Sequence, residues 1–231
     1  DLIILVCENN SLTSLDITQN PNLEKLNCRY NQISNIDLSQ NTALSTLNLS
    51  DNNFSSINIT QNTGLEQLSC EDNLLTSLDV SNNTSLRYFI CGDNQLANLD
   101  ISANPALTYL GCHANQLTSL DVSNNTALEV LSFGKNQLSV IDVSNNTSLN
   151  EIRCYENQLT SLDLSSNTNL TKIDLSYNPL TCLNLKNGFN TNIVVFNSKK
   201  NPNLNCIEVD NPSWSTSNSV SYTHLTLPTT Y

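Results

Sequence analysis

Few residues in this chain have side chains suited to acid–base or nucleophilic chemistry. Its 231 residues include two histidines, His113 and His224. A nucleophile, a base and an orienting carboxylate must converge to catalyse acyl transfer, but Cys112 and His113 are neighbours that point to opposite faces of an extended chain. The carboxylates of Glu71 and Asp93 would lie on an open sheet, without the cleft that acid–base catalysis needs. No glycine-rich phosphate loop occurs among the five glycines. The sequence therefore predicts no enzyme activity, no catalytic residue and no cofactor.

Thiols are the next candidates, because the chain has eight cysteines. Six of them recur at one position of a 21-residue repeat: Cys7, Cys28, Cys70, Cys91, Cys112 and Cys154. Leu49, Phe133 and Leu175 occupy the same position in other copies. A position that accepts Cys, Leu or Phe is a core position, where a thiol packs as a small apolar group. A metal centre would instead need paired, convergent thiols, so the pattern predicts no metal site.

Cys182 and Cys206 differ from the other six cysteines. Each directly precedes an apolar residue, Leu183 and Ile207, at equivalent outward-facing positions one coil apart. They could lie close enough to form a disulfide, which would suit an extracellular protein. Two unpaired neighbouring thiols are the alternative.

The repeat itself must position these side chains. Leucine occurs every 21 residues, at Leu2, Leu23, Leu44, Leu65, Leu86, Leu107, Leu128, Leu149 and Leu170. Nine copies cover residues 2–190, and a longer terminal repeat covers 191–210, so we expect one domain over residues 1–210. Residues 211–231 are interpreted as a cap remnant or tail. From about residue 220 the chain could be non-native, since it resembles a translated sequencing adapter.

Each copy is nearly doubled, as LxxLxCxxNx followed by LxxLDVSxNxx, and each half has an apolar–x–apolar dyad typical of a short strand. Units this short bury their apolar side only by stacking. We therefore expect a mostly β solenoid with short parallel strands on both faces and no long helix. Two columns of asparagine, one per half-repeat, are expected to tolerate left-handed geometry and to satisfy turn backbone on every coil.

The pattern LxxLxCxxNxLxxLDVSxNTx resembles bacterial leucine-rich repeats of the nested 21-residue type. The chain is also similar to leucine-rich repeat proteins secreted by flavobacteria and their relatives. The resemblance covers residues 1–210 and implies a right-handed leucine-rich repeat solenoid. It further implies a secreted or surface-attached location, with the first-half sheet as the ligand face.

Variation among the copies is concentrated on that first-half face. All six basic residues within 2–178 lie in first halves: Lys25, Arg29, Arg87, Lys135, Arg153 and Lys172. All five tyrosines of the array do too: Tyr30, Tyr88, Tyr109, Tyr155 and Tyr177. The second halves barely change. One face thus reads as scaffold, and the other as a candidate binding surface for a protein or a cell-surface glycan.

Stacking makes Tyr88 and Tyr109 lateral neighbours, beside Ile90 and a dent expected at Gly111. Tyrosine gives a flat amphipathic surface, and arginine can bind carboxylates or sulfates bidentately. The predicted ligand-binding residues are Arg87, Tyr88, Ile90, Asp93, Tyr109, His113, Arg153 and Tyr155. The alternative is an ordinary solvated face on a structural spacer without a specific ligand.

The scaffold face has a column of aspartates: Asp16, Asp37, Asp79, Asp100, Asp121, Asp142 and Asp163. Adjacent like charges repel in a sheet, so hydrogen bonds from Ser, Thr and backbone N–H groups are expected to compensate. Calcium binding is an alternative, although each coil supplies only one carboxylate. Ice binding by the regular polar face is another.

Composition excludes some partners. The net charge of −12, from 9 basic and 21 acidic residues, argues against a nucleic-acid partner. The longest apolar run, Leu2 to Cys7, is far too short to cross a bilayer, so no membrane insertion is expected. We expect a monomer with an exposed apolar edge at its first coil, which residues upstream would cover in a longer protein.

Overall fold

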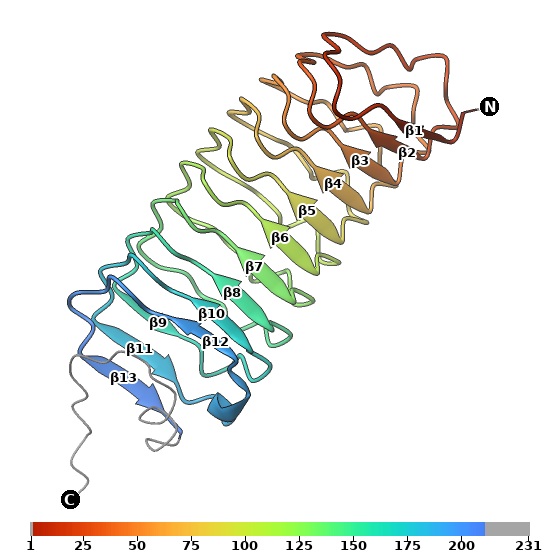
Figure 1. The fold of residues 1–231 in the computed structure, drawn as a ribbon. Helices are drawn as coiled ribbons and strands as arrows, with labels where there is room; N and C mark the ends of the chain where they lie inside the picture. The colour runs from red at the N-terminus through yellow and green to blue at the C-terminus, as the bar shows by residue number, and fades with distance from the viewer. Residues whose placement is uncertain (1, 211–231) are drawn as a thin grey trace, which may run out of the picture.

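The chain coils into an elongated solenoid in the computed structural model, which describes residues 2–210 (Figure 1). Ten parallel strands lie side by side along one face, each next to the strand of the neighbouring coil. They are β1 (Ile4–Val6), β2 (Lys25–Asn27), β3 (Thr46–Asn48), β4 (Gln67–Ser69), β5 (Tyr88–Ile90), β6 (Tyr109–Gly111), β7 (Val130–Ser132), β8 (Glu151–Arg153), β10 (Lys172–Asp174) and β12 (Val195–Asn197). The solenoid predicted from the repeat is confirmed.

The repeat period sets the register of this sheet. Equivalent residues of successive copies face each other, as Tyr88 faces Tyr109 between β5 and β6. After β10 the period stretches, and Lys172 faces Val195 of β12. A single 3₁₀ turn, Asn190–Asn192, is the one helical segment in the described chain.

The opposite face has regular strands only near its C-terminal end. There β9 (Ser161–Asp163), β11 (Cys182–Leu185) and β13 (Cys206–Val209) form a three-stranded parallel sheet. The expectation of strands on both faces is therefore wrong for the earlier coils within residues 2–210. The N–H two residues after the aspartate binds the carboxylate both on those coils and at β9, as Ser81 does with Asp79 at 2.9 Å and Ser165 with Asp163 at 2.9 Å. What β9 has in addition is a backbone bond to the next coil, from Leu164 N–H to the carbonyl of Asn184 at 2.9 Å.

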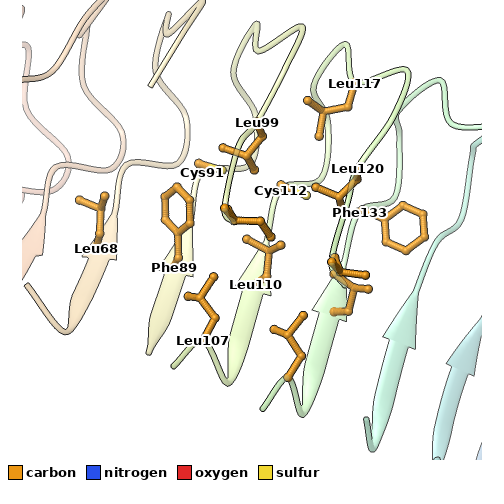
Figure 2. Packing of buried hydrophobic residues seen from close by; sticks show 14 of the residues in the cluster. Leu68, Phe89, Cys91, Leu99, Leu107, Leu110, Cys112, Leu117, Leu120 and Phe133 are labelled. Carbon is orange, nitrogen blue, oxygen red and sulfur yellow. The ribbon is translucent and has the colours of Figure 1, made fainter. Parts of the chain in front are cut away.

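Aliphatic, aromatic and thiol side chains fill the interior between the two faces (Figure 2). Phe54, Phe89 and Phe133 are fully buried, each in a different column of the core. Because these columns contain mostly leucine, isoleucine or cysteine in the other coils, one phenylalanine in a coil changes the local volume without interrupting the stack.

The first asparagine column ties the coils together through its amides. Asn115 Nδ2 donates to the carbonyl oxygens of Cys91, Cys112 and His113 at 3.0–3.2 Å. Its Oδ1 accepts the N–H of Leu96 at 2.9 Å. Every coil from Asn31 to Asn178 repeats this arrangement, so the predicted hydrogen-bonding role is confirmed.

The asparagine pattern predicts left-handed backbone at these asparagines, but the structure does not have it there. It lies one residue earlier, at Asn9, Tyr30, Asp51, Asp72, Asp93, Ala114, Lys135, Glu156, Tyr177 and Lys200, with φ between 48° and 61°. The turn there aims two carbonyl groups of the same coil at the following amide, as those of Cys112 and His113 point at Asn115. Side-chain bonding, rather than conformational tolerance, is therefore what asparagine supplies.

The second asparagine column is bonded on one side only. Asn104 Nδ2 donates to the carbonyls of Val80 and Asn83, and its Oδ1 is buried without a partner. The same holds, within the described chain, for the Oδ1 atoms of Asn41, Asn62, Asn83, Asn125, Asn146 and Asn167. We therefore expect this column to stabilise the stack less than the first, because the buried Oδ1 of each of these asparagines accepts no hydrogen bond.

The first coil exposes apolar side chains, as expected. Ile3, Ile4 and Val6 are 46%, 54% and 61% exposed. No helix within residues 2–210 has the length and apolar character needed to cross a membrane.

Candidate functional site

An aromatic pair lies at the middle of the ten-stranded sheet. The rings of Tyr88 on β5 and Tyr109 on β6 are stacked, with centroids 4.5 Å apart and planes inclined by 26°. Both side chains are half-buried, and burial raises the pKa of Tyr88. The lateral contact predicted from the repeat is confirmed, and it gives the sheet a fixed aromatic surface.

The dent expected at Gly111 is filled. A β-carbon at Gly111 would lie 3.4 Å from Cε1 of Tyr109 and 3.5 Å from Cγ1 of Ile90. Both side chains therefore lean over this glycine, which is buried. The correction has a simple cause, since large side chains collapse onto a neighbour that lacks one. The result is a flat patch of Tyr88, Tyr109 and Ile90 rather than a pocket.

A charged cluster lies next to this patch, in the turns that follow β4, β5 and β6. Nε2 of His113 is 3.2 Å from Oε1 of Glu71 and 3.0 Å from Oδ2 of Asp93. Three successive coils supply the three residues. Asp93 and His113 were predicted as site residues and do come together, whereas Glu71 was not included among them.

The electrostatics of this cluster favour a charged imidazole. The hydrogen bond to Glu71 raises the pKa of His113, helped by the charge of Asp93 and opposed by burial. Consistently, the hydrogen bond from His113 lowers the pKa of Glu71. Next to them, burial and then the charges of Asp93, Asp51 and Glu71 raise the pKa of Asp72. Negative charge is therefore concentrated around one imidazole.

Gly92 explains how Glu71 and His113 meet, although they are two coils apart. The imidazole lies directly over Gly92, where a β-carbon would be only 2.5 Å from Cε1 and 2.7 Å from Nδ1. The Tyr155 ring covers Gly134 in the same way, with its Cδ1 2.6 Å from where a β-carbon would be.

A sequence signal for this arrangement exists. At the repeat position of His113, large and small residues alternate from the second copy onward: Arg29, Ser50, Glu71, Gly92, His113, Gly134, Tyr155 and Ser176. Side chains in such a column can lie across a small neighbour and contact the coil beyond it. The pattern is visible in the sequence, but the direction in which each side chain leans is not.

The structure divides the eight predicted site residues into two groups. Arg87, Tyr88, Ile90, Asp93, Tyr109 and His113 lie on or just beside β5 and β6. Arg153 and Tyr155 belong to the coil of β8, two coils beyond β6, or about 10 Å at the usual strand spacing. Arg153 is bound to Glu151, which also contacts Lys172 Nζ at 3.2 Å. Arg153 is therefore engaged in an ion-pair cluster, whereas Arg87 is exposed beside the tyrosine pair.

The aspartate column on the opposite face has the hydrogen bonding expected of a scaffold. Asp79, Asp100 and Asp121 each accept the N–H of the serine two residues on at 2.9 Å. Hydrogen bonds from Ser81 lower the pKa of Asp79, and the equivalent bonds act on its neighbours. Shallow hollows lie between these coils.

The calcium alternative predicts a melting temperature that rises with calcium, and ice binding predicts thermal hysteresis.

The repeated cysteines lie in the core, as predicted. Cys28, Cys70, Cys91, Cys112 and Cys154 are fully buried, and Cys7 in the first coil is partly buried. Burial raises the pKa of Cys28, Cys70 and Cys112 to about 12. Cys182 and Cys206 are free thiols that face each other across β11 and β13. A hydrogen bond with Cys182 raises the pKa of Cys206 to about 11. The proposed disulfide thus has the right neighbours, and its oxidation stays a prediction.

Alkylation of the folded protein should separate these two classes of thiol. The reactive species is the thiolate, so the buried, high-pKa thiols of the column should stay unmodified at pH 8 while the exposed Cys182 reacts. Mass spectrometry of iodoacetamide-treated protein, before and after urea unfolding, measures this. Labelling of Cys91 or Cys112 in the native state would contradict their burial. Loss of Cys182 labelling that reductant restores would indicate the disulfide.

Two segments match known sequence families. Residues 166–182 match the leucine-rich repeat family, and residues 131–157 match the LVIVD repeat. Both segments lie within the solenoid. No curated protein matches the chain by sequence.

Solved structures show a wider similarity. The functional domain of InlJ from Listeria monocytogenes, which includes a cysteine ladder, is 31% identical over 87% of this chain and 54% of its own, with a TM-score of 0.67. A leucine-rich repeat protein of Leptospira interrogans is 24% identical over 91% of this chain and 61% of its own, with a TM-score of 0.67. TLR13, in a complex with ssRNA13, is 21% identical over 90% of this chain and 31% of its own, with a TM-score of 0.61.

These matches show that the fold is a leucine-rich repeat solenoid. The chain spans about half of the InlJ domain and about three fifths of the Leptospira protein. Leucine-rich repeat proteins are typically protein-binding modules. The nested 21-residue class and the similarity to flavobacterial proteins stay predictions from the sequence. So does the exclusion of nucleic acid, which depends on charge rather than on fold.

Proposed function

We propose that this leucine-rich repeat solenoid is a non-enzymatic module that binds a protein or a cell-surface glycan on its ten-stranded sheet. The observation that carries the proposal is the stacked pair of Tyr88 and Tyr109, with Ile90 beside it. These side chains form a flat, partly apolar surface in the middle of the most variable face. Interfaces favour such central aromatic anchors, surrounded by polar residues.

Charged groups border this aromatic patch on both sides. Arg87 is exposed at one edge, and the cluster of Glu71, Asp93 and His113 lies at the other. A ligand that covers the tyrosines would therefore meet a positive and a mainly negative border at once. This arrangement supports selectivity, because charges around an interface steer the ligand and reject wrong partners.

We also propose a secreted or cell-surface location and a monomeric state. The resemblance of the repeat to secreted bacterial proteins supports the location. Fractionation of the source organism and light scattering of the purified protein would test the two statements.

The aromatic patch can be tested by a double substitution. Tyr88→Ala with Tyr109→Ala should abolish capture of whichever ligand the parent protein selects from arrays of glycans and cell-surface proteins. The melting temperature should fall by less than about 5 °C, because the pairing of two half-buried aromatic rings contributes only about 0.5–1.5 kcal/mol to stability.

A matched control removes two other tyrosines of the same sheet side. Tyr30 and Tyr177 lie several coils from the patch and are 45% and 54% exposed, so Tyr30→Ala with Tyr177→Ala should retain capture. Equal capture by the patch variant would place the binding surface elsewhere. An array that returns no ligand for the parent would favour the structural spacer.

A further inference from the structure

One imidazole and two carboxylates converge on a single point of the sheet, beside the tyrosine patch. Nε2 of His113 contacts Oε1 of Glu71 and Oδ2 of Asp93 at 3.2 and 3.0 Å. All three ligand atoms lie within 4.8 Å of one another. Among the described residues this is the one group of three His, Cys, Asp or Glu side chains so arranged. We propose that Glu71, Asp93 and His113 bind a divalent transition-metal ion of the Zn²⁺ type.

The dimensions of the cluster suit such an ion. Zn²⁺ binds imidazole nitrogen at about 2.0–2.1 Å and carboxylate oxygen at about 2.0–2.2 Å, usually in a tetrahedron. Ligand atoms at two corners of that tetrahedron are therefore about 3.4 Å apart. The Nε2–O distances of 3.0 and 3.2 Å are only a few tenths of an ångström shorter. An ion could thus replace the proton that His113 now donates, with small rotations of three side chains.

The backbone beneath the cluster is held in place by the solenoid. Asp93 N–H donates to the carbonyl of His113 at 2.9 Å, and Asp72 N–H donates to that of Gly92 at 3.1 Å. The ligands therefore project from adjacent, hydrogen-bonded coils rather than from a loose loop. Such preorganisation lowers the cost of bringing ligands together around an ion.

Gly92 determines whether the histidine can reach the site. Its missing side chain lets the imidazole lie flat across the intervening coil, which aims Nε2 at the two carboxylates. A β-carbon at position 92 would lie 2.5 Å from Cε1 of His113, which is a steric clash. The glycine is therefore a positioning residue, although it supplies no ligand atom.

The surrounding charges also favour a cation. Asp51, Asp72 and Asp93 follow one another along neighbouring coils next to Glu71, and Arg29 is paired with Asp51 at 2.7 Å. The side chains of Glu71, Asp93 and His113 are 24%, 43% and 25% exposed. Three protein ligands would leave at least one coordination position open to solvent. A carboxylate or imidazole of a ligand on the tyrosine patch could fill that position, but the metal site itself does not depend on the proposed function.

Metal binding should be measured on the full chain with the metal alone. Because the exposed thiol of Cys182 and the partly buried thiol of Cys206 could also bind zinc, the parent protein for the test carries Cys182→Ser and Cys206→Ser. We expect this parent to bind one Zn²⁺ by isothermal titration calorimetry. We also expect it to give the visible absorption of tetrahedral Co²⁺ when cobalt replaces zinc.

Three variants of that parent test the assigned residues. His113→Asn and Glu71→Gln each remove a ligand, and Gly92→Ala keeps all three ligands but displaces the imidazole. Each should weaken Zn²⁺ binding at least tenfold, in line with the 10–100-fold effect of altering the support of a metal ligand. Circular dichroism spectra and melting curves identify any variant that fails to fold, and the two remaining variants then decide the result.

His224→Asn is the matched control, since it removes the other histidine of the chain and should leave the affinity within about twofold. The proposal is overturned if the parent binds neither Zn²⁺ nor Co²⁺ at millimolar concentration. It is also overturned if His113→Asn binds as tightly as the parent, or if binding is lost in His224→Asn instead. The cluster would then be an ion-pair network only.

Discussion

Replacing Asn115 with alanine is expected to lower the free energy of unfolding by roughly 2–4 kcal/mol. The substitution removes the acceptor of the Leu96 N–H group, which has no other partner among the bonds of the structure. The carbonyls of Cys91 and Cys112 keep a hydrogen bond, because each also accepts one from a second asparagine, Asn94 and Asn136 respectively. One orphaned buried donor and a small cavity therefore account for the expected loss.

Two control variants test whether the loss comes from the hydrogen bonds of the first asparagine column. Asn104→Ala, in the second asparagine column, should lower the free energy of unfolding clearly less. The Asn104 Oδ1 accepts no hydrogen bond, and the Val80 carbonyl still accepts one from the Asn83 N–H after the substitution. Gln116→Ala, at the exposed position next to Asn115, should have almost no effect.

Urea unfolding followed by circular dichroism ranks the three variants, and hydrogen exchange adds a local measurement. The Leu96 amide should lose protection in Asn115→Ala but not in Asn104→Ala. Repeat arrays can unfold in steps, so the local measurement is the more direct one. Equal destabilisation by the two asparagine variants would mean that the hydrogen bonds of the first column do not decide the stability of the stack.

Acid is expected to destabilise the solenoid through its aspartate column. Seven carboxylates have folded-state pKa values below the ordinary 3.8, because each accepts hydrogen bonds from a Ser or Thr two residues on: Asp16, Asp37, Asp79, Asp100, Asp121, Asp142 and Asp163. A carboxyl group whose pKa is lowered by folding stabilises the native state in its ionised form. This stability is complete above the unfolded-state pKa and is lost as the pH falls through the folded-state pKa.

The melting temperature should therefore hold above about pH 5 and then fall steeply toward pH 2. The repeat makes the effect large, since seven similar sites add their contributions. Repulsion between neighbouring carboxylates acts in the opposite direction, but the hydrogen bonds are the larger cause of the shift at every one of the seven.

Asparagine offers a matched replacement, because the chain already uses it at two positions of the column. Asn58 and Asn184 accept the N–H groups of Thr60 and Lys186 in the same way. A triple variant, Asp79→Asn, Asp100→Asn and Asp121→Asn, should keep the hydrogen bonds and remove about three sevenths of the acid dependence due to the column. Melting curves from pH 2 to pH 7 would show this. An unchanged slope would assign the acid sensitivity to other carboxylates, such as Glu71.

Much of the fold could be predicted because the same physical demand recurs on every coil. A leucine every 21 residues places apolar side chains at fixed positions of a coil, and nine copies leave little choice of register. The cysteines could be assigned to the core for the same reason, since Leu49 and Phe133 replace them at equivalent positions. The asparagine columns followed from their repetition, although their left-handed neighbours did not.

The candidate site was predictable only in part. The repeat register correctly placed Tyr88 beside Tyr109, because strand pairing determines which columns are neighbours. It could not show that Tyr109 and Ile90 fill the space at Gly111, or that Arg153 is bound to Glu151. Those contacts depend on side-chain conformations, which differ from coil to coil because the neighbours differ.

The sequence by itself determined the coil, its core and the face that varies, because those features are periodic and each copy repeats the evidence. Only the tertiary structure decided which individual side chains meet on that face. Glu71 and His113 contact each other across Gly92 because a side chain can lean over a neighbour that has none, as Tyr155 also does over Gly134. The chemistry of this protein therefore lies in the departures from its repeat, where periodicity carries no information about direction.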